Sequence, residues 1–250
     1  MVTDDSSVSI VIAVYNAEDT IKACLISCFE QNYPCKKLIV IDGGSTDGTK
    51  KVLSAYADQF AYWVSEPDNG IYHAWNKALQ VVTTDWVVFL GADDKWSNAT
   101  SLSKMMEMAR YPSVNFVCAK VYKTPYMNCK GYMFGDPWDY SRMKWRMNVG
   151  HTGMLHHTSL FREYGFFDET YRIAGDYEFL LRAGKSIRAQ YLSEPIVLMG
   201  GGGVSSTNLS IVLKEGQRAL RESSDFGVFY AWFFSLRFCL RHFRRLTVSN

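Results

Sequence analysis

Short apolar runs that alternate with helical patterns constrain the fold of this chain more than any other feature. The runs cover residues 8–14, 37–41, 60–64 and 86–90. Between them, apolar residues recur three and four positions apart, which is the spacing of one helix face. Strands that are apolar on both sides and alternate with helices are typical of a parallel sheet covered on both faces. The sequence therefore predicts a doubly wound α/β domain.

Polar clusters follow these runs, at the points where the strands should end. Tyr15 and Asn16 follow the first run, Asp42 and two glycines the second, and Asp93 with Asp94 the fourth. Turns alone favour Asp, Gly and Asn, but ligands in such sheets also bind at the carboxyl ends of the strands. Acidic clusters at the ends of two apolar strands exceed what turns require, so we expect a functional cleft along this edge.

The two acidic clusters predict different chemistry. Asp93 and Asp94 are adjacent, so one carboxylate can bind Mg²⁺ or Mn²⁺ while the other orients a loop or a ribose. A helix cap is the structural alternative for this pair. Asp42 can accept a hydrogen bond from a nucleobase or ribose, because the glycines after it allow close approach. A Gly-x-Gly-x-x-Gly motif after the first strand and a P-loop are both missing, which disfavours dinucleotide dehydrogenases and P-loop nucleotidases.

An ordered set of motifs resembles the family 2 glycosyltransferases, which are inverting enzymes with the GT-A fold. The set covers residues 8–16, 41–49, 65–72, 89–94 and 175–182. This resemblance implies a GT-A domain over residues 1–225. Its nucleotide-sugar half would span about 8–110 and its acceptor half 111–225.

The resemblance also implies a donor site. Ala13, Tyr15 and Asp42 would surround the base of a nucleotide-sugar. The expected donor is linked to UDP. Asn76 and Lys77 belong to a segment that lies beside the donor in bacterial surface-polysaccharide members. A solvated helix charge is an equal alternative for Lys77.

The metal site departs from the pattern of the family. Asp93 aligns with the metal-binding residue of the Asp-x-Asp motif and Asp94 with a ribose or sugar contact, but Gly91 replaces the first Asp. Binding of Mn²⁺ or Mg²⁺ would then depend on Asp93, the diphosphate and water, with Asp94 or His151 as further ligands. His151 resembles a position where a histidine approaches the diphosphate or the acceptor.

Asp176 aligns with the catalytic base of the family. A carboxylate beside the acceptor hydroxyl takes its proton as it attacks, and direct displacement inverts the anomeric centre. Gly175 stands where the family often has Glu, and a helix cap is the structural alternative for Asp176. Glu178 is the second candidate for the base.

The last 25 residues carry an unusual charge pattern. No acidic residue follows Asp225, whereas four arginines do, and these account for the positive excess in a net charge of +2. Phe229, Phe233, Leu236, Leu240 and Phe243 share one helical stripe beside the arginines. This pattern predicts an amphipathic helix over residues 226–250. The helix would either bind an anionic membrane surface or pack on the core.

The combined expectation is an inverting, metal-dependent hexosyltransferase of cell-surface polysaccharide (O-antigen type) synthesis. Its partners would be a nucleotide-sugar and a saccharide or lipid-linked oligosaccharide, and not nucleic acid, since the rest of the chain is mildly acidic. A polyprenyl-phosphate sugar synthase is one alternative, and a non-catalytic nucleotide- or carbohydrate-binding module is another. Asp4 and Asp5 are untypical of a signal peptide, so a cytoplasmic location, peripheral on the inner membrane, is expected.

Overall fold

The first half of the chain alternates strands and helices, as its apolar pattern predicts. We describe residues 6–127, 129–203 and 208–247 of a computed structural model, with side chains of the last helix as far as Arg237; Asp4 and Asp5 lie outside this part. The first elements are β1 (Val8–Val14), α1 (Ile21–Phe29), β2 (Lys36–Asp42), α2 (Thr49–Ser54), β3 (Tyr62–Ser65), α3 (Ile71–Val81) and β4 (Trp86–Gly91).

The second half is less regular and ends in two long helices. It contains β5 (Lys95–Trp96), α4 (Ser101–Ala109), β6 (Phe116–Lys123), β7 (Tyr132–Phe134), α5 (Tyr140–Met143), β8 (Met154–His157), α6 (Ser159–Tyr164), α7 (Gly175–Ala183), β9 (Ala189–Met199), α9 (Leu209–Glu222) and α10 (Gly227–Thr247). Short 3₁₀ turns lie at Ala57–Gln59, His151–Gly153 and Gly184–Ser186.

The described strands form one mixed sheet in the order β3-β2-β1-β4-β8-β6-β9-β5, with β7 paired to β6. β3, β2, β1 and β4 are parallel, whereas β8 runs antiparallel to both β4 and β6. The chain leaves β1 toward β2 on one side and reaches β4 on the other. This reversal of strand order creates the crevice in which ligands of such sheets bind.

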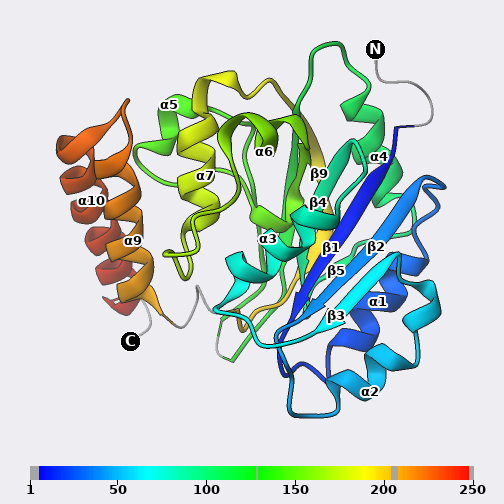
Figure 1. The fold of residues 1–250 in the computed structure, drawn as a ribbon. Coiled ribbons are helices and arrows are strands. Elements are labelled where there is room, and N and C mark those ends of the chain that lie inside the picture. Colours follow the sequence, from blue (N-terminus) through cyan, green and yellow to red (C-terminus); the bar gives the residue numbers. More distant parts are fainter. Residues whose placement is uncertain (1–5, 128, 204–207, 248–250) are drawn as a thin grey trace.

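Both faces of the sheet are covered by helices, as Figure 1 shows. Alternate residues of β1 serve the two sides: Ile10 and Ile12 join the core under α1, α2 and α4, and Val11 joins the core under α3, α6 and α7. Burial on both sides explains why the strands read as continuous apolar runs rather than as alternating ones. The helix pair α9–α10 lies outside α7, at the far left of Figure 1.

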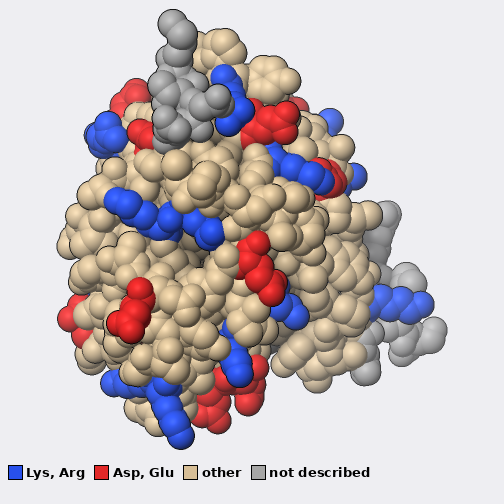
Figure 2. All heavy atoms as spheres, turned by 90° about the vertical axis from the view of Figure 1, so that its right-hand side faces the viewer, with Lys and Arg blue, Asp and Glu red and all other residues tan. Residues whose placement is uncertain are grey.

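The face that carries α1, α2 and α4 has no single dominant charge. Figure 2 shows Lys and Arg interspersed with Asp and Glu on this side of the molecule, among a majority of other residues. Opposite charges at this density produce no extended field of one sign. This face therefore provides no electrostatic reason for a charged partner.

A loop separates β1 from the first helix. Asparagine can cap a helix, but Asn16 lies five residues before the start of α1 at Ile21. Asn16 instead has a left-handed backbone (φ 47°), and its Oδ1 accepts a hydrogen bond from the Thr46 amide at 2.8 Å. Asparagine tolerates this conformation better than most residues, so Asn16 joins the loops after β1 and β2.

The C-terminal residues form a helix, and part of it packs on the domain. Phe234 of α10 stacks on Tyr177 of α7, with ring centroids 6.1 Å apart, and covers Gly216 of α9. Phe233 is half-buried against Trp145, while Phe229 and Leu236 are exposed, so the predicted apolar stripe is divided between two faces. The side chains of Leu240, Phe243 and the last three arginines lie outside the described part. No helix in that part is long and apolar enough to cross a bilayer.

Candidate active site

The ends of β1, β2 and β4 bring the first group of predicted residues together. In the parallel register Ala13 lies between Ile41 and Gly91, and Val14 pairs with Asp42. Ala13 is half-buried here, on the central strand of the edge. The sheet therefore places Ala13 beside Gly91, the glycine that opens the Asp93–Asp94 turn, and Asp42 on the other side of β1.

Asp42 and Tyr15 occupy opposite environments. Asp42 is fully buried, and its carboxylate accepts hydrogen bonds from the Ser45 amide at 3.1 Å and from the Ser65 hydroxyl at 2.5 Å. Tyr15 is 62% exposed. In this arrangement a ring can pack on Tyr15 directly, whereas a base reaches Asp42 only in competition with the two serines. The roles predicted for both residues stay predictions.

Asp93 and Asp94 point to different surroundings, as adjacent residues at a strand end should. Asp93 is exposed. Asp94 is buried, and its two oxygens accept from the Gly91 amide at 2.8 Å and the Gly200 amide at 3.0 Å. Burial and, next, the negative charge of Asp93 raise the pKa of Asp94 to about 7. Asp94 thus fastens the end of β9 to the end of β4.

The carboxylates at this turn supply some, but not all, of the oxygen ligands that Mg²⁺ or Mn²⁺ needs. A Cβ at position 200 would lie 1.8 Å from Asp93 Oδ2, so Gly200 leaves the space that this carboxylate occupies. Two carboxylates that repel each other are stabilised by a cation between or beside them. Within the described residues, however, no group of three or more His, Cys, Asp or Glu side chains is arranged to hold a metal. Any Mg²⁺ or Mn²⁺ would need further oxygen ligands from a substrate or from water.

Asp176 lies in the first turn of α7, where residues from distant parts of the chain converge on it. Tyr72 of α3 places its hydroxyl 3.1 Å from Asp176 Oδ1 and donates to the Ile173 carbonyl at 2.6 Å. His151 places Nδ1 3.2 Å from Asp176 Oδ2. The Asp176 and His151 side chains are each 14% exposed. Asp176 is therefore a held carboxylate with limited access to solvent, as a general base requires.

His151 is positioned by an aromatic ring rather than by hydrogen bonds. Its imidazole stacks on Trp75 of α3, with centroids 4.4 Å apart and planes 15° apart. Both ring nitrogens and the Trp75 Nε1 are buried and make no hydrogen bond within the described residues, although Nδ1 lies within ion-pair distance of Asp176 Oδ2. Buried polar atoms left in this way favour a site that binds something. Nothing in the sequence pattern links Trp75 to His151.

An acidic residue of α9 fixes the loop that precedes Asp176. The Glu215 carboxylate accepts hydrogen bonds from three consecutive backbone amides, Arg172 at 2.8 Å, Ile173 at 2.8 Å and Ala174 at 2.9 Å. Three charge-assisted hydrogen bonds define the approach to α7. Glu215 was not predicted, because a single acid on a polar helix face carries no signal in the sequence.

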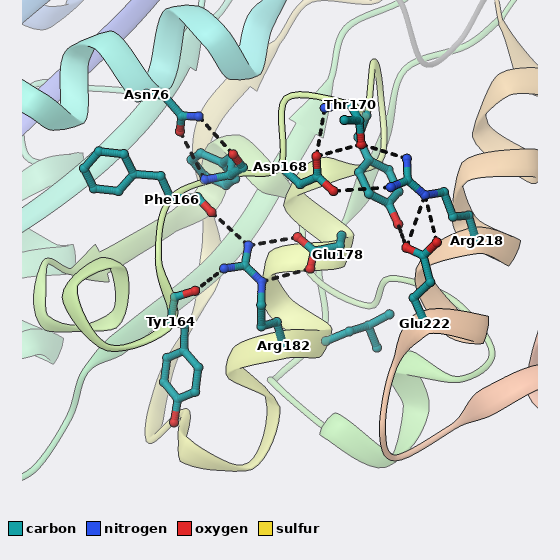
Figure 3. Close-up of polar contacts among 12 residues, drawn as sticks. Asn76, Tyr164, Phe166, Asp168, Thr170, Glu178, Arg182, Arg218 and Glu222 are labelled. Atoms are coloured by element: carbon teal, nitrogen blue, oxygen red, sulfur yellow. Dashed lines mark hydrogen bonds and ion pairs between the residues drawn. The ribbon is translucent and has the colours of Figure 1, made fainter.

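Two predicted site residues lie in supporting networks instead of the cleft (Figure 3). Asn76 is buried, donates to the Phe167 carbonyl at 2.9 Å and accepts from the Phe167 amide at 3.1 Å. Glu178 binds Arg182 through both oxygens at 2.9 Å, and Arg182 also reaches the carbonyl of Phe166. Both side chains hold the segment between α6 and α7.

Lys77 is engaged at the donor edge of the sheet. Its Nζ lies 2.9 Å from Glu66 Oε1 and 3.0 Å from the Pro67 carbonyl. These contacts tie α3 to the loop after β3. The ammonium group therefore lies close to the predicted donor edge, already paired with Glu66.

A cavity of about 360 Å³ opens beside Asp176. Asp176 and His151 line one part of it, and α9 and α10 line another. The residues in its walls are Lys123, Tyr132, Phe134, Trp145, Arg146, Met147, Val149, Ile173, Ala174, Tyr177, Met199, Val212, Gly216, Phe234 and Arg237. Glu178 is not among them, so Asp176 is the α7 carboxylate that faces this space.

Comparison with known proteins agrees with this arrangement. Residues 9–166 match the model of glycosyl transferase family 2. A PGL/p-HBAD biosynthesis glycosyltransferase of Mycobacterium bovis is 27% identical over 226 residues, which cover 88% of this chain and 86% of the relative. The chain therefore belongs to glycosyl transferase family 2, and by this membership it is a glycosyltransferase.

Solved structures show the same fold. S. aureus TarS 1-349, solved in complex with UDP-GlcNAc, is similar with a TM-score of 0.71 and 18% identity over 95% of this chain and 73% of that one. The mannosyltransferase PcManGT from Pyrobaculum calidifontis, solved with GDP-Man and Mn²⁺, has a TM-score of 0.69 and 21% identity over 93% and 70%. The predicted GT-A-like α/β fold with C-terminal helices is thus confirmed.

Proposed function

We propose that the protein is an inverting hexosyltransferase that moves a sugar from a UDP-linked donor to a hydroxyl of a saccharide or lipid-linked saccharide in cell-surface glycan synthesis. The observation that carries the proposal is the placement of Asp176, held by Tyr72 and His151 at the edge of a cavity. A glycosyltransferase needs such a carboxylate beside the acceptor.

The proposed step follows from the position of this carboxylate. The acceptor oxygen attacks the anomeric carbon, its proton passes to Asp176, and the bond to the diphosphate breaks on the opposite face of the sugar. Displacement in one step inverts the anomeric configuration. The Tyr72 hydroxyl lies 3.1 Å from Oδ1, and burial together with the charge of Asp176 raises the pKa of Tyr72 well above its usual value, so this phenol remains protonated.

Asp93 is the residue proposed to hold Mn²⁺ or Mg²⁺, with Asp94 behind it. A bound divalent cation would neutralise charge on the departing diphosphate. The PcManGT complex with GDP-Man and Mn²⁺ supports the class of metal, and the TarS complex with UDP-GlcNAc supports a nucleotide-sugar donor. Envelope glycan acceptors are supported by the biosynthetic role in the name of the mycobacterial relative.

The test compares isosteric variants of the two α7 carboxylates. Sugar transfer and hydrolysis of UDP-glucose and UDP-GlcNAc with Mn²⁺ are measured for wild type, Asp176→Asn and Glu178→Gln, with UDP affinity by calorimetry. We expect Asp176→Asn to lose about 100-fold or more in turnover with UDP affinity retained.

A comparable loss in Glu178→Gln alone would move the base to that residue. Asp93→Ala should weaken only the Mn²⁺-dependent part of UDP binding. UDP binding without any turnover in wild type would favour the non-catalytic alternative, and no UDP binding at all would overturn the proposal.

A peripheral membrane contact through α10 is proposed as well. Val228, Phe229, Trp232 and Leu236 form an outer apolar row with exposed fractions of 69%, 66%, 62% and 45%. The sequence places four arginines and no acid in the same segment. Exposed aromatic residues next to basic ones suit the interface of an anionic membrane. The cytoplasmic face of the inner membrane is the location proposed for this contact.

A further inference from the structure

The cavity beside Asp176 extends away from the donor edge. Lys123 and Met199 line it at the ends of the paired strands β6 and β9, next to Gly200, which contacts Asp94. Asp176 and His151 also line it, and α9 and α10 contribute Val212 and Phe234. One cavity therefore joins the end of β9, the α7 carboxylate and the two C-terminal helices.

The walls of this cavity are largely apolar. Val149, Ile173, Met199, Val212 and Phe234 contribute carbon surface, and Tyr132, Phe134, Trp145 and Tyr177 contribute aromatic surface. Among the described lining residues there is no Asn, Gln, Ser or Thr. Sugar hydroxyls that leave water for such a surface lose hydrogen bonds, which is unfavourable, whereas an alkyl or aryl group gains from the same transfer.

Two of the basic residues in the walls have acidic partners or neighbours, and the third is exposed. Arg146 pairs with Asp136 at 2.7 Å, the charge of Lys123 is attracted to that of Asp94, and Arg237 of α10 is exposed. α9 and α10 pack closely at Gly216, where a Cβ would lie only 2.8 Å from the ring of Phe234. The apolar wall is thus a built part of the domain, formed where α10 packs on α9.

We infer that this cavity receives an apolar group, alkyl or aryl, that the acceptor carries next to its reacting hydroxyl. The inference rests on the proposed function and specifies the acceptor: its hydroxyl lies at Asp176 and its apolar part lies against Val212, Met199 and Phe234. α10 is then a wall of the acceptor site as well as a surface helix.

The first test uses three glycosides of one sugar, because the natural acceptor is not needed for it. Methyl, phenyl and octyl β-glucoside, the last below its micelle concentration, are compared by ligand-observed NMR with the full chain, UDP and Mn²⁺ present. Burial of a phenyl or alkyl group should strengthen binding by about tenfold or more over the methyl glycoside. Preference for phenyl indicates an aryl source and preference for octyl a lipid source. Equal binding of all three overturns the inference.

The second test fills the cavity from one wall. Val212→Trp should abolish the preference for the apolar glycosides, whereas Leu209→Trp, an exposed position on the same helix that does not line the cavity, should retain it. UDP affinity, measured by calorimetry on both variants, should stay at the wild-type value. If UDP binds and Val212→Trp keeps the preference, the inference is wrong; if UDP binds to neither variant nor to wild type, the proposed function is wrong.

Discussion

The two oxygens of Asp176 have different neighbours, and this difference assigns them different tasks. Oδ1 accepts a hydrogen bond from the Tyr177 amide at 2.9 Å and has the Tyr72 hydroxyl 3.1 Å away. Oδ2 lies 3.2 Å from His151 Nδ1 and accepts no hydrogen bond from a backbone amide among the described residues. Because hydrogen-bonded lone pairs are poor proton acceptors, Oδ2 is the oxygen that should take the acceptor proton.

His156, in contrast, is a buried histidine without a place in the site. It is 1% exposed and is surrounded by Phe89, Phe116, Phe161 and Phe179. Burial, with a smaller contribution from the charge of His151, lowers its pKa to about 3. The folded protein therefore keeps His156 neutral at pH values where an unfolded chain would protonate it.

This difference predicts a pH dependence of stability. Between pH 6.5 and about 3 the unfolded state binds one more proton at this residue, so stability falls as the pH falls. The contribution is about 1.4 kcal/mol per pH unit. His156→Leu should remove it, so the difference in unfolding free energy between wild type and variant should change steadily from pH 7 to pH 5 in urea titrations. His73→Leu, at a half-buried position on α3, is the control that should keep the wild-type slope; an unchanged slope in His156→Leu would contradict the assignment.

At the scale of elements, α9 positions α7, the helix that carries the proposed base Asp176. Its Glu215 holds the three amides before α7, and its Arg218 packs over the ring of Tyr171 at 4.3 Å and pairs with Asp168 (Figure 3). Side chains of α3, α7 and α9 thus hold the segment between α6 and α7 in place. Because Asp176 directly follows this segment, its position depends on these contacts.

Glu215→Gln tests this positioning role. In the variant an NH₂ group replaces one carboxylate oxygen and faces at least one of the three backbone N–H groups. Because two donors cannot form a hydrogen bond with each other, the loop before α7 should become more mobile. We expect the turnover number to fall about tenfold, since small displacements of a catalytic group are costly, while the KM for the UDP-sugar stays unchanged. Lys214→Gln, the exposed neighbour, should leave both constants at wild-type values. A rise in donor KM with unchanged turnover would instead place Glu215 in the donor site.

The elements differ in how far the sequence predicts them. β1 and β4 are evident because strands buried on both faces need unbroken apolar runs. The convergence of Tyr72, His151 and Asp176 is not evident, because Tyr72 and Asp176 lie about a hundred residues apart in the chain. The hydrogen bonds of Asn76 are not evident for a related reason: the segment 166–169 that they reach carries no local pattern.

Across the whole molecule, the proposed donor edge, the cavity beside Asp176 and the outer row of α10 are parts of one domain. The strand ends carry Asp93 and Asp94, Asp176 lines the cavity, and α10 closes that cavity with Phe234 while its opposite side is exposed. One helix therefore contacts both the cavity and the solvent. An acceptor with an apolar part, presented at a membrane surface, would approach this side of the molecule.

The membrane contact is best tested on the outer row alone. Removal of the whole tail would also remove Phe234, which lines the cavity beside Asp176, and would confuse two effects. Phe229→Ser combined with Trp232→Ser alters only exposed side chains, so hydrolysis of a soluble UDP-sugar should persist. Binding to phosphatidylglycerol vesicles, measured by co-sedimentation, should weaken by about tenfold or more, because apolar surface no longer enters the interface. Tyr111→Ser changes an exposed aromatic residue beyond α4 and is the control, which should bind vesicles as wild type does. Added salt should weaken vesicle binding of the wild type, because the arginines contribute through their charge. If the double variant sediments with vesicles as wild type does, the outer row of α10 makes no membrane contact, and α10 contributes only to the cavity.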